Sequence, residues 1–429
     1  MMAGGESSEP LLDVRDLTTR FFTEEGQVNA VESVDLTVHD GEVFGVVGES
    51  GSGKSVTALS LIDLVESPGE IVAGEVWYRD ADLASEMAAS HPDAVDGDAV
   101  DLRRVPPEVR RSLRGSSVSM IFQDPMSSFN PSITVGEQIA EAVEVQRRAS
   151  TNPRSTRSRT QGFGLGSMLA STVIPTRDYV GEESHERAIE LLGQVGIPDP
   201  EARAGEYPHQ YSGGMLQRAM VAQALAGEPD LLIADEPTTA LDVTIEAQIL
   251  NLLADLQDEL DMAIVLITHD LGVIARTCDR LGVMYAGEIV EHGSLEDVFD
   301  SPVHPYTQGL LGSIPDLDDP APRLDPIEGN VPSLVAAEMD DRCYFADRCP
   351  KAMEECLDKP PAFAVDGAGV AEEADGTGAD AAGSATGSDG VPGDATSHTA
   401  KCYLADHEFD EARALPEGYF DESDGGSDT

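Results

Sequence analysis

The chain has 429 residues, 41% of them hydrophobic, which is enough for two domains or for one large domain with an extension. Its 80 acidic residues against 27 Lys and Arg give a formal net charge of −53, which argues against nucleic acid as a general partner, because phosphate binding requires a basic face. Such a surface repels itself unless salt screens it, so the charge predicts a cytosolic protein of a halophile with a salt-rich cytoplasm. No apolar run reaches roughly 18 residues, and residues 1–10 are polar, so we expect a flexible N-terminal tail and neither a signal peptide nor a membrane span.

The first ordered segment has the periodicity of β-strands. Residues 11–40 alternate apolar and polar side chains, and Glu24-Glu25-Gly26 predicts a turn between two strands. Phe21 and Phe22 lie just before this turn. Either ring is a candidate to stack on an adenine base, and burial in a small core is an equally good interpretation of each.

A glycine-rich segment follows the apolar run 43–47 and has the pattern G-x-x-x-x-G-K-S. Between a buried strand and a helix, this pattern predicts a loop whose backbone N–H groups bind phosphate, with the helix N-terminus adding positive charge. Lys54 is expected to reach the β- and γ-phosphates of a nucleoside triphosphate, and the Ser55 hydroxyl to bind Mg²⁺. The residues expected to bind the nucleotide are Gly48, Glu49, Ser50, Gly51, Ser52, Gly53, Lys54 and Ser55.

A strand is predicted at residues 74–78, and the polar, acidic segment 91–101 after it predicts an exposed loop. The apolar run 118–122 predicts another strand, which ends at Gln123. Open α/β sheets bind ligands at the carboxyl ends of their strands, so Gln123 can reach Mg²⁺ or an attacking water. An ordinary loop residue is the alternative interpretation.

Residues 134–205 are expected to be partly helical. Within them, the basic segment 147–159 predicts a solvated, mobile loop, with lipid headgroups or an acidic partner as the alternative. Ser212, Gly213 and Gly214 then precede a predicted helix at 216–226, and the backbone at its N-terminus provides a second anion site.

Two further apolar strands end in polar residues. Residues 231–236 end in Asp235, expected to hold Mg²⁺ through water, and Glu236, expected to polarise the water that attacks the γ-phosphate. Residues 263–267 lead to His269, a candidate donor to the γ-phosphate, with a structural histidine as the alternative. Between these strands, Asp242 lies in a turn before a predicted helix at 244–260.

Four of the five cysteines gather near the C-terminus: Cys343, Cys349, Cys356 and Cys402. They supply enough thiolates for a tetrahedral Zn²⁺ or an iron–sulfur cluster, and in a cytosol metal binding is favoured over disulfides. The spacing differs from that of a zinc ribbon. The Gly-, Ala- and Asp-rich segment 365–400 lacks aromatic, Leu and Ile residues, so we expect a disordered acidic insert there.

The order of these motifs resembles the motif set of the ATP-binding subunits of ABC transporters, over roughly residues 11–301. By this resemblance Gln123 is the Q-loop, Ser212 begins the signature, Asp242 is the D-loop and His269 is the switch histidine. The resemblance implies an α/β P-loop NTPase fold with a RecA-like core, an antiparallel β-subdomain and a helical subdomain at about 125–212, together forming a domain at 11–300. It also implies ATP and Mg²⁺ as cofactors and catalytic roles for Glu236, His269 and Gln123.

Met215, residues 122–126 and Tyr207-Pro208-His209 resemble the oligopeptide/dipeptide/nickel importer branch of that family. Segments 304–311, 327–332 and 343–350 resemble its small C-terminal, cysteine-containing extension, here 301–429. Asp341 and Arg342 depart from the Pro and Gly that are usual there, which weakens the expected turn. Similar members carry a [4Fe–4S] cluster at this place, which favours a cluster over Zn²⁺ at the four cysteines.

The resemblance also implies partners and a location. These are two transmembrane permease subunits, a second ABC ATPase, and indirectly an extracellular solute-binding protein, at the cytoplasmic face of the cell membrane. The second ATPase is a paralogue or another copy, paired head to tail so that the phosphate loop of one subunit and the Ser212 helix of the other enclose the same ATP.

The predicted function is to power the import of dipeptides or oligopeptides, with nickel complexes or oligosaccharides as alternative solutes. The rival from another class is a soluble ABC ATPase of DNA repair or chromosome maintenance. That rival predicts coiled-coil or zinc-hook insertions and basic DNA-binding faces, and the sequence contains neither.

Overall fold

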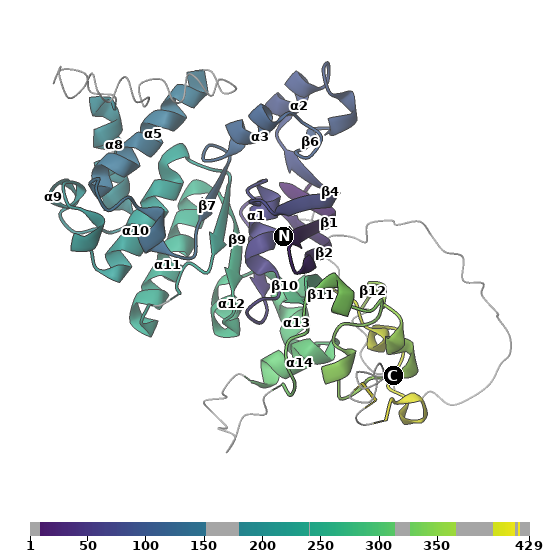
Figure 1. The fold of residues 1–429 in the computed structure, drawn as a ribbon. Coiled ribbons are helices and arrows are strands. Elements are labelled where there is room, and N and C mark those ends of the chain that lie inside the picture. Colours follow the sequence, from purple (N-terminus) through teal and green to yellow (C-terminus); the bar gives the residue numbers. More distant parts are fainter. Residues whose placement is uncertain are drawn as a thin grey trace, which may run out of the picture.

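The computed structural model describes residues 9–151, 180–239, 241–313, 327–365, 398–416 and 419–420 (Figure 1). Residues 1–8 of the predicted tail at 1–10 and most of the predicted acidic insert at 365–400 lie outside these ranges, as does the basic segment from residue 152 onward. Thr399 and Ala400, at the end of that insert, form a short strand.

A five-stranded antiparallel sheet is built from the alternating sequence near the N-terminus, in the order β2-β1-β4-β6-β5. Thr23 pairs with Gly26, which closes the β1–β2 hairpin at the predicted turn; Gly26 has a φ of 139°, which favours glycine. The strands are β1 (Leu12–Thr23), β2 (Gly26–Val38), β4 (Gly69–Arg79), β5 (Val95–Asp96) and β6 (Ala99–Asp101).

The prediction of an exposed loop at residues 91–101 is wrong in part, because only residues 92, 93 and 96–98 are exposed. This segment contains the β5–β6 hairpin, and β6 pairs with β4. Val100 and Asp101 are fully buried, and the Asp101 carboxylate accepts hydrogen bonds from the backbone N–H groups of Val76 and Arg103. The acidic composition led to the prediction of a loop. The sequence alone does not distinguish a buried, hydrogen-bonded carboxylate from a solvated one.

The central sheet has eight strands in the order β12-β13-β11-β10-β3-β9-β8-β7. The strands from β10 to β7 are parallel, whereas β11, β13 and β12 are antiparallel at one edge. The carboxyl ends of β3, β7, β8 and β9 therefore meet at one edge of the sheet. The bounds are β3 (Val43–Val47), β7 (Val118–Ile121), β8 (Leu231–Asp235), β9 (Ala263–Thr268), β10 (Arg280–Tyr285), β11 (Glu288–Ser294), β12 (Phe363–Ala364) and β13 (Thr399–Ala400).

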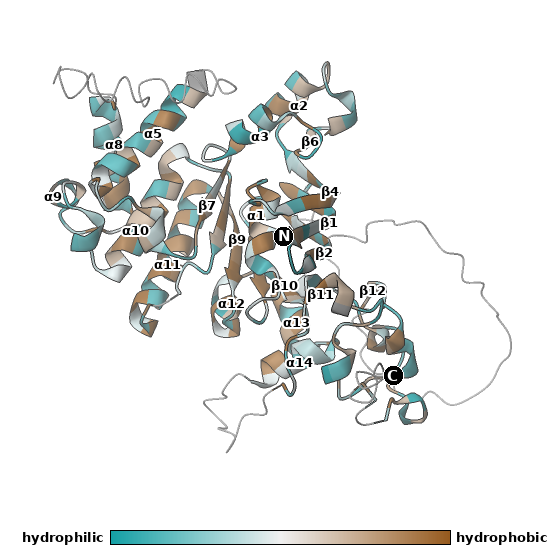
Figure 2. Cartoon of the chain, in the orientation of Figure 1, coloured by the Kyte–Doolittle hydropathy of each residue, from teal (hydrophilic) through white to brown (hydrophobic). Residues whose placement is uncertain are grey.

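The two faces of the central sheet belong to different hydrophobic cores. Alternate residues of β8, such as Leu232, lie in the core that contains Leu216 of α10 (Gly213–Ala224). Their neighbours, such as Ile233, lie in the core that contains Leu61 of α1 (Lys54–Leu61). Helices α1 and α10 therefore pack on opposite faces, and β7 and β9 between them are hydrophobic along most of their length (Figure 2).

Helices of the middle of the chain pack against the face that carries α10. The predicted helices at 136–143 and 186–192 lie within α5 (Val135–Thr151) and α8 (Glu182–Gln194), which contact each other. The remaining helices of this region are α4 (Pro125–Ser128), α9 (Pro200–Ala204), α11 (Val243–Leu260) and α12 (Leu271–Thr277). No helix in the described part of the chain has the length and apolar composition that a membrane span requires.

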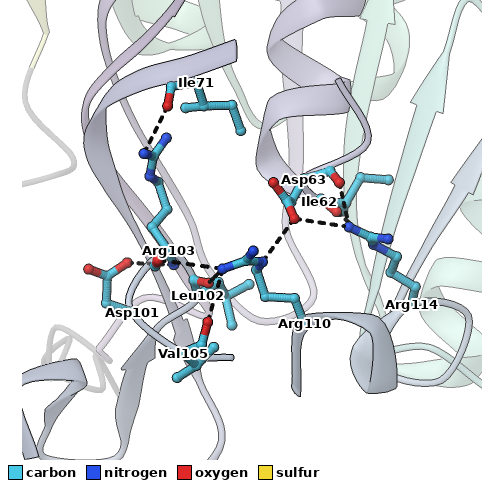
Figure 3. Close-up of polar contacts among 9 residues, drawn as sticks. All are labelled: Ile62, Asp63, Ile71, Asp101, Leu102, Arg103, Val105, Arg110 and Arg114. Atoms are coloured by element: carbon cyan, nitrogen blue, oxygen red, sulfur yellow. Dashed lines mark hydrogen bonds and ion pairs between the residues drawn. The ribbon is translucent and has the colours of Figure 1, made fainter. Parts of the chain in front are cut away.

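The segment between β4 and β7 in the chain contains α2 (Ala81–Met87) and α3 (Pro107–Leu113), and arginines at its end hold it to the C-terminal end of α1 (Figure 3). The Asp63 carboxylate, just after α1, accepts hydrogen bonds from Nε of Arg110 at 2.8 Å and from Nη2 of Arg114 at 3.4 Å. Arg114 also donates from Nε to the carbonyl of Ile62 at 2.8 Å. The end of α1 that lies away from the phosphate loop is thereby fixed.

The C-terminal region continues through α13 (Leu295–Asp300) and α14 (Pro305–Gly312) and then folds back onto the central sheet. In β13, Ala400 pairs with Glu291 of β11, and His398 Nε2 lies 2.8 Å from Oε1 of the fully buried Glu291 carboxylate. A small core forms around Met353 and Cys356. This region is therefore packed against the sheet that carries the candidate site.

Candidate active site

The glycine-rich loop joins the buried strand β3 to α1, as predicted. A Cβ atom at position 48 would lie 2.1 Å from the carbonyl oxygen of Met284, and one at position 53 would lie 2.3 Å from that of Ala30. Gly53 also has a φ of 106°, which strains any residue with a side chain. Glycine is thus required at both positions for the loop to close over the start of α1.

Lys54 is the first residue of α1 and is buried. Its Nζ atom donates to the carbonyl oxygens of Gly48 at 2.8 Å and Glu49 at 2.9 Å. Burial lowers the pKa of the Lys54 ammonium, and the nearby carboxylates of Glu236 and Asp235 offset this effect in part. The ammonium is thus held across the loop, where the pattern predicts phosphate oxygens.

Ser55 and Asp235 come together although 180 residues separate them, because β8 and β3 are both neighbours of β9. The Ser55 hydroxyl donates to Oδ1 of Asp235 at 3.0 Å. Burial raises the pKa of Asp235, and the hydrogen bond from Ser55 opposes that rise. A hydroxyl and a buried carboxylate at this distance fit Mg²⁺, which prefers few protein oxygen ligands and keeps several waters.

Glu236 follows β8 and is surrounded by hydrogen-bond donors. Its Oε2 atom accepts from Gln123 Nε2 and from the Thr239 hydroxyl, both at 2.8 Å, and its Oε1 atom lies 3.3 Å from Nδ1 of His269. Burial alone would raise the pKa of Glu236, but the donors from Thr239, His269 and Gln123 outweigh it and lower the pKa. The structure therefore places Gln123 and His269, two of the three predicted catalytic side chains, in contact with the third, Glu236, beside the Ser55 and Asp235 pair.

The backbone of Glu236 is unusual, with a φ of 46°. A side-chain-bearing residue in this left-handed region costs of order 1 kcal/mol or more, and such strain persists where the surrounding structure holds it. The N–H of Glu236 donates to the carbonyl of Ile267, in the neighbouring strand β9, at 2.9 Å. This contact helps to aim the carboxylate at the strand ends.

The two predicted anion sites do not come together within one chain. Ser212 caps α10, where its hydroxyl accepts from the N–H of Met215 at 3.3 Å, and α10 packs on the sheet face opposite α1. Gly214 packs against Ile245, so the signature glycines adjoin the start of α11. Asp242 caps α11 by accepting from the N–H groups of Thr244 and Ile245.

The two candidate adenine-stacking rings differ in their surroundings. Phe22 is 47% exposed. Phe21 is half-buried and packs against Gly69, where a Cβ atom would lie 2.7 Å from its ring. Both rings lie at the end of β1, next to the β1–β2 hairpin turn.

Three contacts of the site were not predicted from the sequence. Thr239 contacts Glu236, whereas Tyr306 and Arg348, from the C-terminal region, both contact Glu49 of the phosphate loop. Thr239 lies three residues after Glu236, and that spacing could have indicated it. Nothing local indicates the other two, which are 257 and 299 residues from Glu49.

The four C-terminal cysteines line one small pocket, together with His304, Phe345 and Met353 among others. Burial raises the pKa of the Cys343, Cys349 and Cys402 thiols to about 12 and also raises that of Cys356. Within the described ranges, no group of three or more His, Cys, Asp or Glu side chains is arranged to hold a metal ion. The four thiols thus lie around one pocket.

A glycine-rich phosphate loop between β3 and α1, facing acidic residues at the ends of parallel strands, defines a P-loop nucleoside triphosphatase. The family model for "ABC transporter" matches residues 31–239, and that for "Oligopeptide/dipeptide transporter, C-terminal region" matches residues 290–356.

Two similar proteins show how far the likeness extends. A peptide import ATP-binding protein of Brucella abortus (strain 2308) is 42% identical over 358 residues, 83% of this chain and 92% of the relative. A peptide ABC transporter ATP-binding protein of Sinorhizobium fredii (strain NBRC 101917 / NGR234) is 44% identical over 365 residues, 85% of this chain and 94% of the relative. The chain is also similar in structure to a solved dimer of an ATP-binding cassette with bound ADP and Pi. The match covers 66% of this chain and 98% of the chain in that structure, at 24% sequence identity and a TM-score of 0.48.

The chain belongs to the ABC transporter ATP-binding proteins, in the oligopeptide/dipeptide/nickel importer branch of that family. Like the rest of that family, it is an ATPase.

Proposed function

We propose that this chain hydrolyses ATP at the strand ends of its central sheet to power an ABC importer. The observation that carries the proposal is the contact of Glu236 with Gln123 and His269, beside the Ser55 and Asp235 pair. Glu236 would take the proton of the attacking water, and a lowered pKa keeps its carboxylate ionised for that task. His269 would donate to the γ-phosphate, and Gln123 would orient the water.

Mg²⁺ would be held by Ser55 and, through water, by Asp235, and it would neutralise charge on the β- and γ-phosphates. The backbone of the loop 48–55 and the Lys54 ammonium would bind the phosphate oxygens. Phe21 or Phe22 would stack on the adenine. We assign the nucleotide-binding domain to residues 11–300, its helical subdomain to about 125–212 and the importer-type extension to 301–429.

A second ATPase subunit would complete the site. Ser212, Gly213 and Gly214 provide an anion-binding helix N-terminus on the sheet face opposite α1, which supports their use by a partner and not by their own chain. Asp242 would lie at the same boundary between the two subunits. Binding of ATP between two subunits would close the pair, and hydrolysis would allow it to open.

The imported solute is proposed from the relatives, which are named for peptide import. We infer that this ATPase drives uptake of dipeptides or oligopeptides with two transmembrane permeases, at the cytoplasmic face of the membrane, supplied by an extracellular solute-binding protein. Nickel complexes or oligosaccharides are the alternative solutes.

We also propose that Cys343, Cys349, Cys356 and Cys402 hold a [4Fe–4S] cluster, with Zn²⁺ as the alternative. Their position around one pocket supports a shared site, since a [4Fe–4S] cluster and a Zn²⁺ ion each take four cysteine ligands. A broad absorption band near about 400 nm in anaerobically purified protein, lost on Cys349→Ser, is expected. Purified protein that contains stoichiometric zinc and lacks this absorption band would show that the four cysteines bind Zn²⁺ and not a cluster.

The function is tested in proteoliposomes that contain the complete transporter with its binding protein. ATP hydrolysis that rises with added peptide, together with uptake of a labelled peptide, is expected. If only a nickel complex or only an oligosaccharide stimulated ATP hydrolysis, the imported solute would belong to that class and not to the peptides. A transporter whose purified ATPase pair neither binds nor hydrolyses ATP would contradict the proposal as a whole.

A further inference from the structure

Glu49, the second residue of the phosphate loop, is held at each of its polar groups. Its N–H donates to the Tyr306 hydroxyl at 2.9 Å, and its carbonyl accepts from Lys54 Nζ at 2.9 Å. Its carboxylate accepts from both terminal nitrogens of Arg348, at 3.0 Å and 3.2 Å. Two of these three partners come from the C-terminal region and not from the loop or its helix.

Arg348 is fixed in place by contacts on every side. Its side chain is only 6% exposed. Nε donates to the carbonyl of Glu328 at 2.9 Å, and Nη1 also lies 3.3 Å from the Tyr285 hydroxyl. The guanidinium lies 5.8 Å from the ring centres of both Tyr285 and Phe345. A planar guanidinium held in this way presents a rigid, two-pronged donor to one carboxylate.

An aromatic cluster connects Arg348 to the body of the protein. Tyr285, at the end of β10, lies 4.5 Å from Tyr306 and 5.3 Å from Phe345 between ring centres, and all three rings are buried. Tyr306 and Arg348 therefore approach Glu49 from one packed unit. Two contacts of the phosphate loop thus come from that unit.

A carboxylate in a phosphate loop opposes the binding of phosphates, since both groups are negatively charged. At short range and partly out of water, like charges disfavour each other strongly, and an opposite charge in contact removes most of the effect. The Glu49 side chain is 24% exposed, so solvent screens it only in part. Arg348 supplies the opposite charge.

We propose that Arg348 is a positioning residue for nucleotide binding, which neutralises Glu49 and, with Tyr306, holds the phosphate loop in its binding shape. The inference rests on the proposed function, because it assumes that the loop binds ATP. It gives the C-terminal region a direct part in ATP affinity, through two named contacts with the loop.

The test is titration of the full-length protein with a fluorescent (methylanthraniloyl) ATP and with its ADP counterpart, in Mg²⁺ at fixed ionic strength. Arg348→Gln leaves Glu49 unneutralised, so ATP binding weakens roughly tenfold, and binding of the less charged ADP weakens less. Arg348→Gln combined with Glu49→Gln removes the repulsion and recovers most of the ATP affinity. Tyr306→Phe weakens both nucleotides by a similar factor, since it affects loop shape and not charge.

Arg342→Gln is the matched control, because Arg342 pairs with Asp347 in the same region and contacts Phe420 but not the phosphate loop. Its ATP affinity should equal that of the wild type, and thermal midpoints of all variants establish that they fold.

Unchanged ATP binding in Arg348→Gln would overturn the inference. ATP affinity in the double variant that is no higher than in Arg348→Gln alone would also overturn it. That result would mean that Arg348 does not act by neutralising Glu49. If the wild-type protein bound no ATP, the proposed function itself would be contradicted. That result differs from a wild type that binds ATP and an Arg348→Gln variant that binds it equally well, which contradicts only the role of Arg348.

Discussion

Nε2 of Gln123 donates to Oε2 of Glu236 at 2.8 Å, across 113 residues of sequence. The contact follows from strand register, because Ile121 of β7 pairs with Ala234 of β8, and each of the two polar side chains lies two residues further on. Parallel neighbours end at the same edge of a sheet, so the residues after them meet there. The amide thereby fixes one oxygen of the carboxylate that we assign as the base.

Replacing the proposed base tests its role directly. Glu236→Gln keeps the shape of the side chain but cannot accept a proton, so ATP hydrolysis should fall by roughly 10²- to 10⁴-fold. ATP should still bind, and the bound state should accumulate as a closed pair of subunits. Phosphate release and light scattering measure the two effects. Glu259→Gln, an exposed acid at the end of α11, is the control and should hydrolyse ATP at the wild-type rate. Hydrolysis by Glu236→Gln within a few-fold of wild type would show that another group is the base.

Removing one donor to Glu236 should move the pH profile of hydrolysis in a known direction. The Thr239 hydroxyl is one of the contacts that lower the pKa of Glu236, so Thr239→Val raises that pKa. A base acts only when ionised, and its activity is lost as the pH falls through its pKa. The acidic limb of kcat should therefore move to higher pH, and a pH series that extends well below 4.5 measures it.

Thr239→Ser is the matched variant, because it keeps the hydroxyl and should keep the wild-type profile. A limb that stays in place in Thr239→Val, or moves to lower pH, would exclude this hydrogen bond as the cause of the lowered pKa.

The parts of the site that follow from local pattern were predicted, and the parts that depend on distant contacts were not. The phosphate loop is specified by glycines at 48 and 53 and by the strand and helix beside them, all of which the sequence displays. Glu236 was predicted from its place at a strand end. The contacts of Tyr306 and Arg348 with Glu49 depend on how the C-terminal region packs, and no short motif encodes that packing.

The same distinction explains the hairpin at 91–101. A buried acid is inferred from its donors, and two donors of Asp101 are backbone N–H groups, which every residue except proline has. Nε of Arg104, 3.1 Å from Oδ2 of Asp101, is the one side-chain contact among these that the sequence could have indicated. The two-residue strand β5 is also too short to show a period of two. Composition therefore indicated a loop, while the pairing of β6 with β4 decided the structure.

The net charge of −53 predicts that salt stabilises the protein. At about 3 M KCl the Debye length is below about 3 Å, so repulsion among the acidic side chains is almost fully screened. The thermal midpoint should therefore rise steadily between about 0.1 M and about 3 M KCl. The same series in sucrose, which does not screen charge, separates this effect from general solute exclusion. A midpoint independent of KCl would remove the support for a salt-rich cytoplasm.

Glu144 should control stability in acid. It lies in α5 with its side chain 3% exposed and accepts hydrogen bonds from Ser184 of α8 at 2.6 Å and from Arg148 Nε at 2.7 Å. Burial alone would raise the pKa of Glu144, but the bonds from Ser184, Arg148 and Arg147 outweigh it and lower the pKa to about 2. A lowered pKa contributes stability that is present above the unfolded value near 4.5 and is lost as the pH falls toward about 2.

Glu144→Gln should therefore lower the free energy of unfolding at pH 7 by up to about 3 kcal/mol, and the difference from wild type should shrink below about pH 4.5. Thermal midpoints at a series of pH values measure it. Glu183→Gln is the control, because Glu183 pairs with Arg147 while 80% exposed, and exposed pairs contribute little, so its effect should be small at every pH. A Glu144→Gln deficit that stays constant down to about pH 3 would mean that the side chain contributes through packing and not through its ionised form.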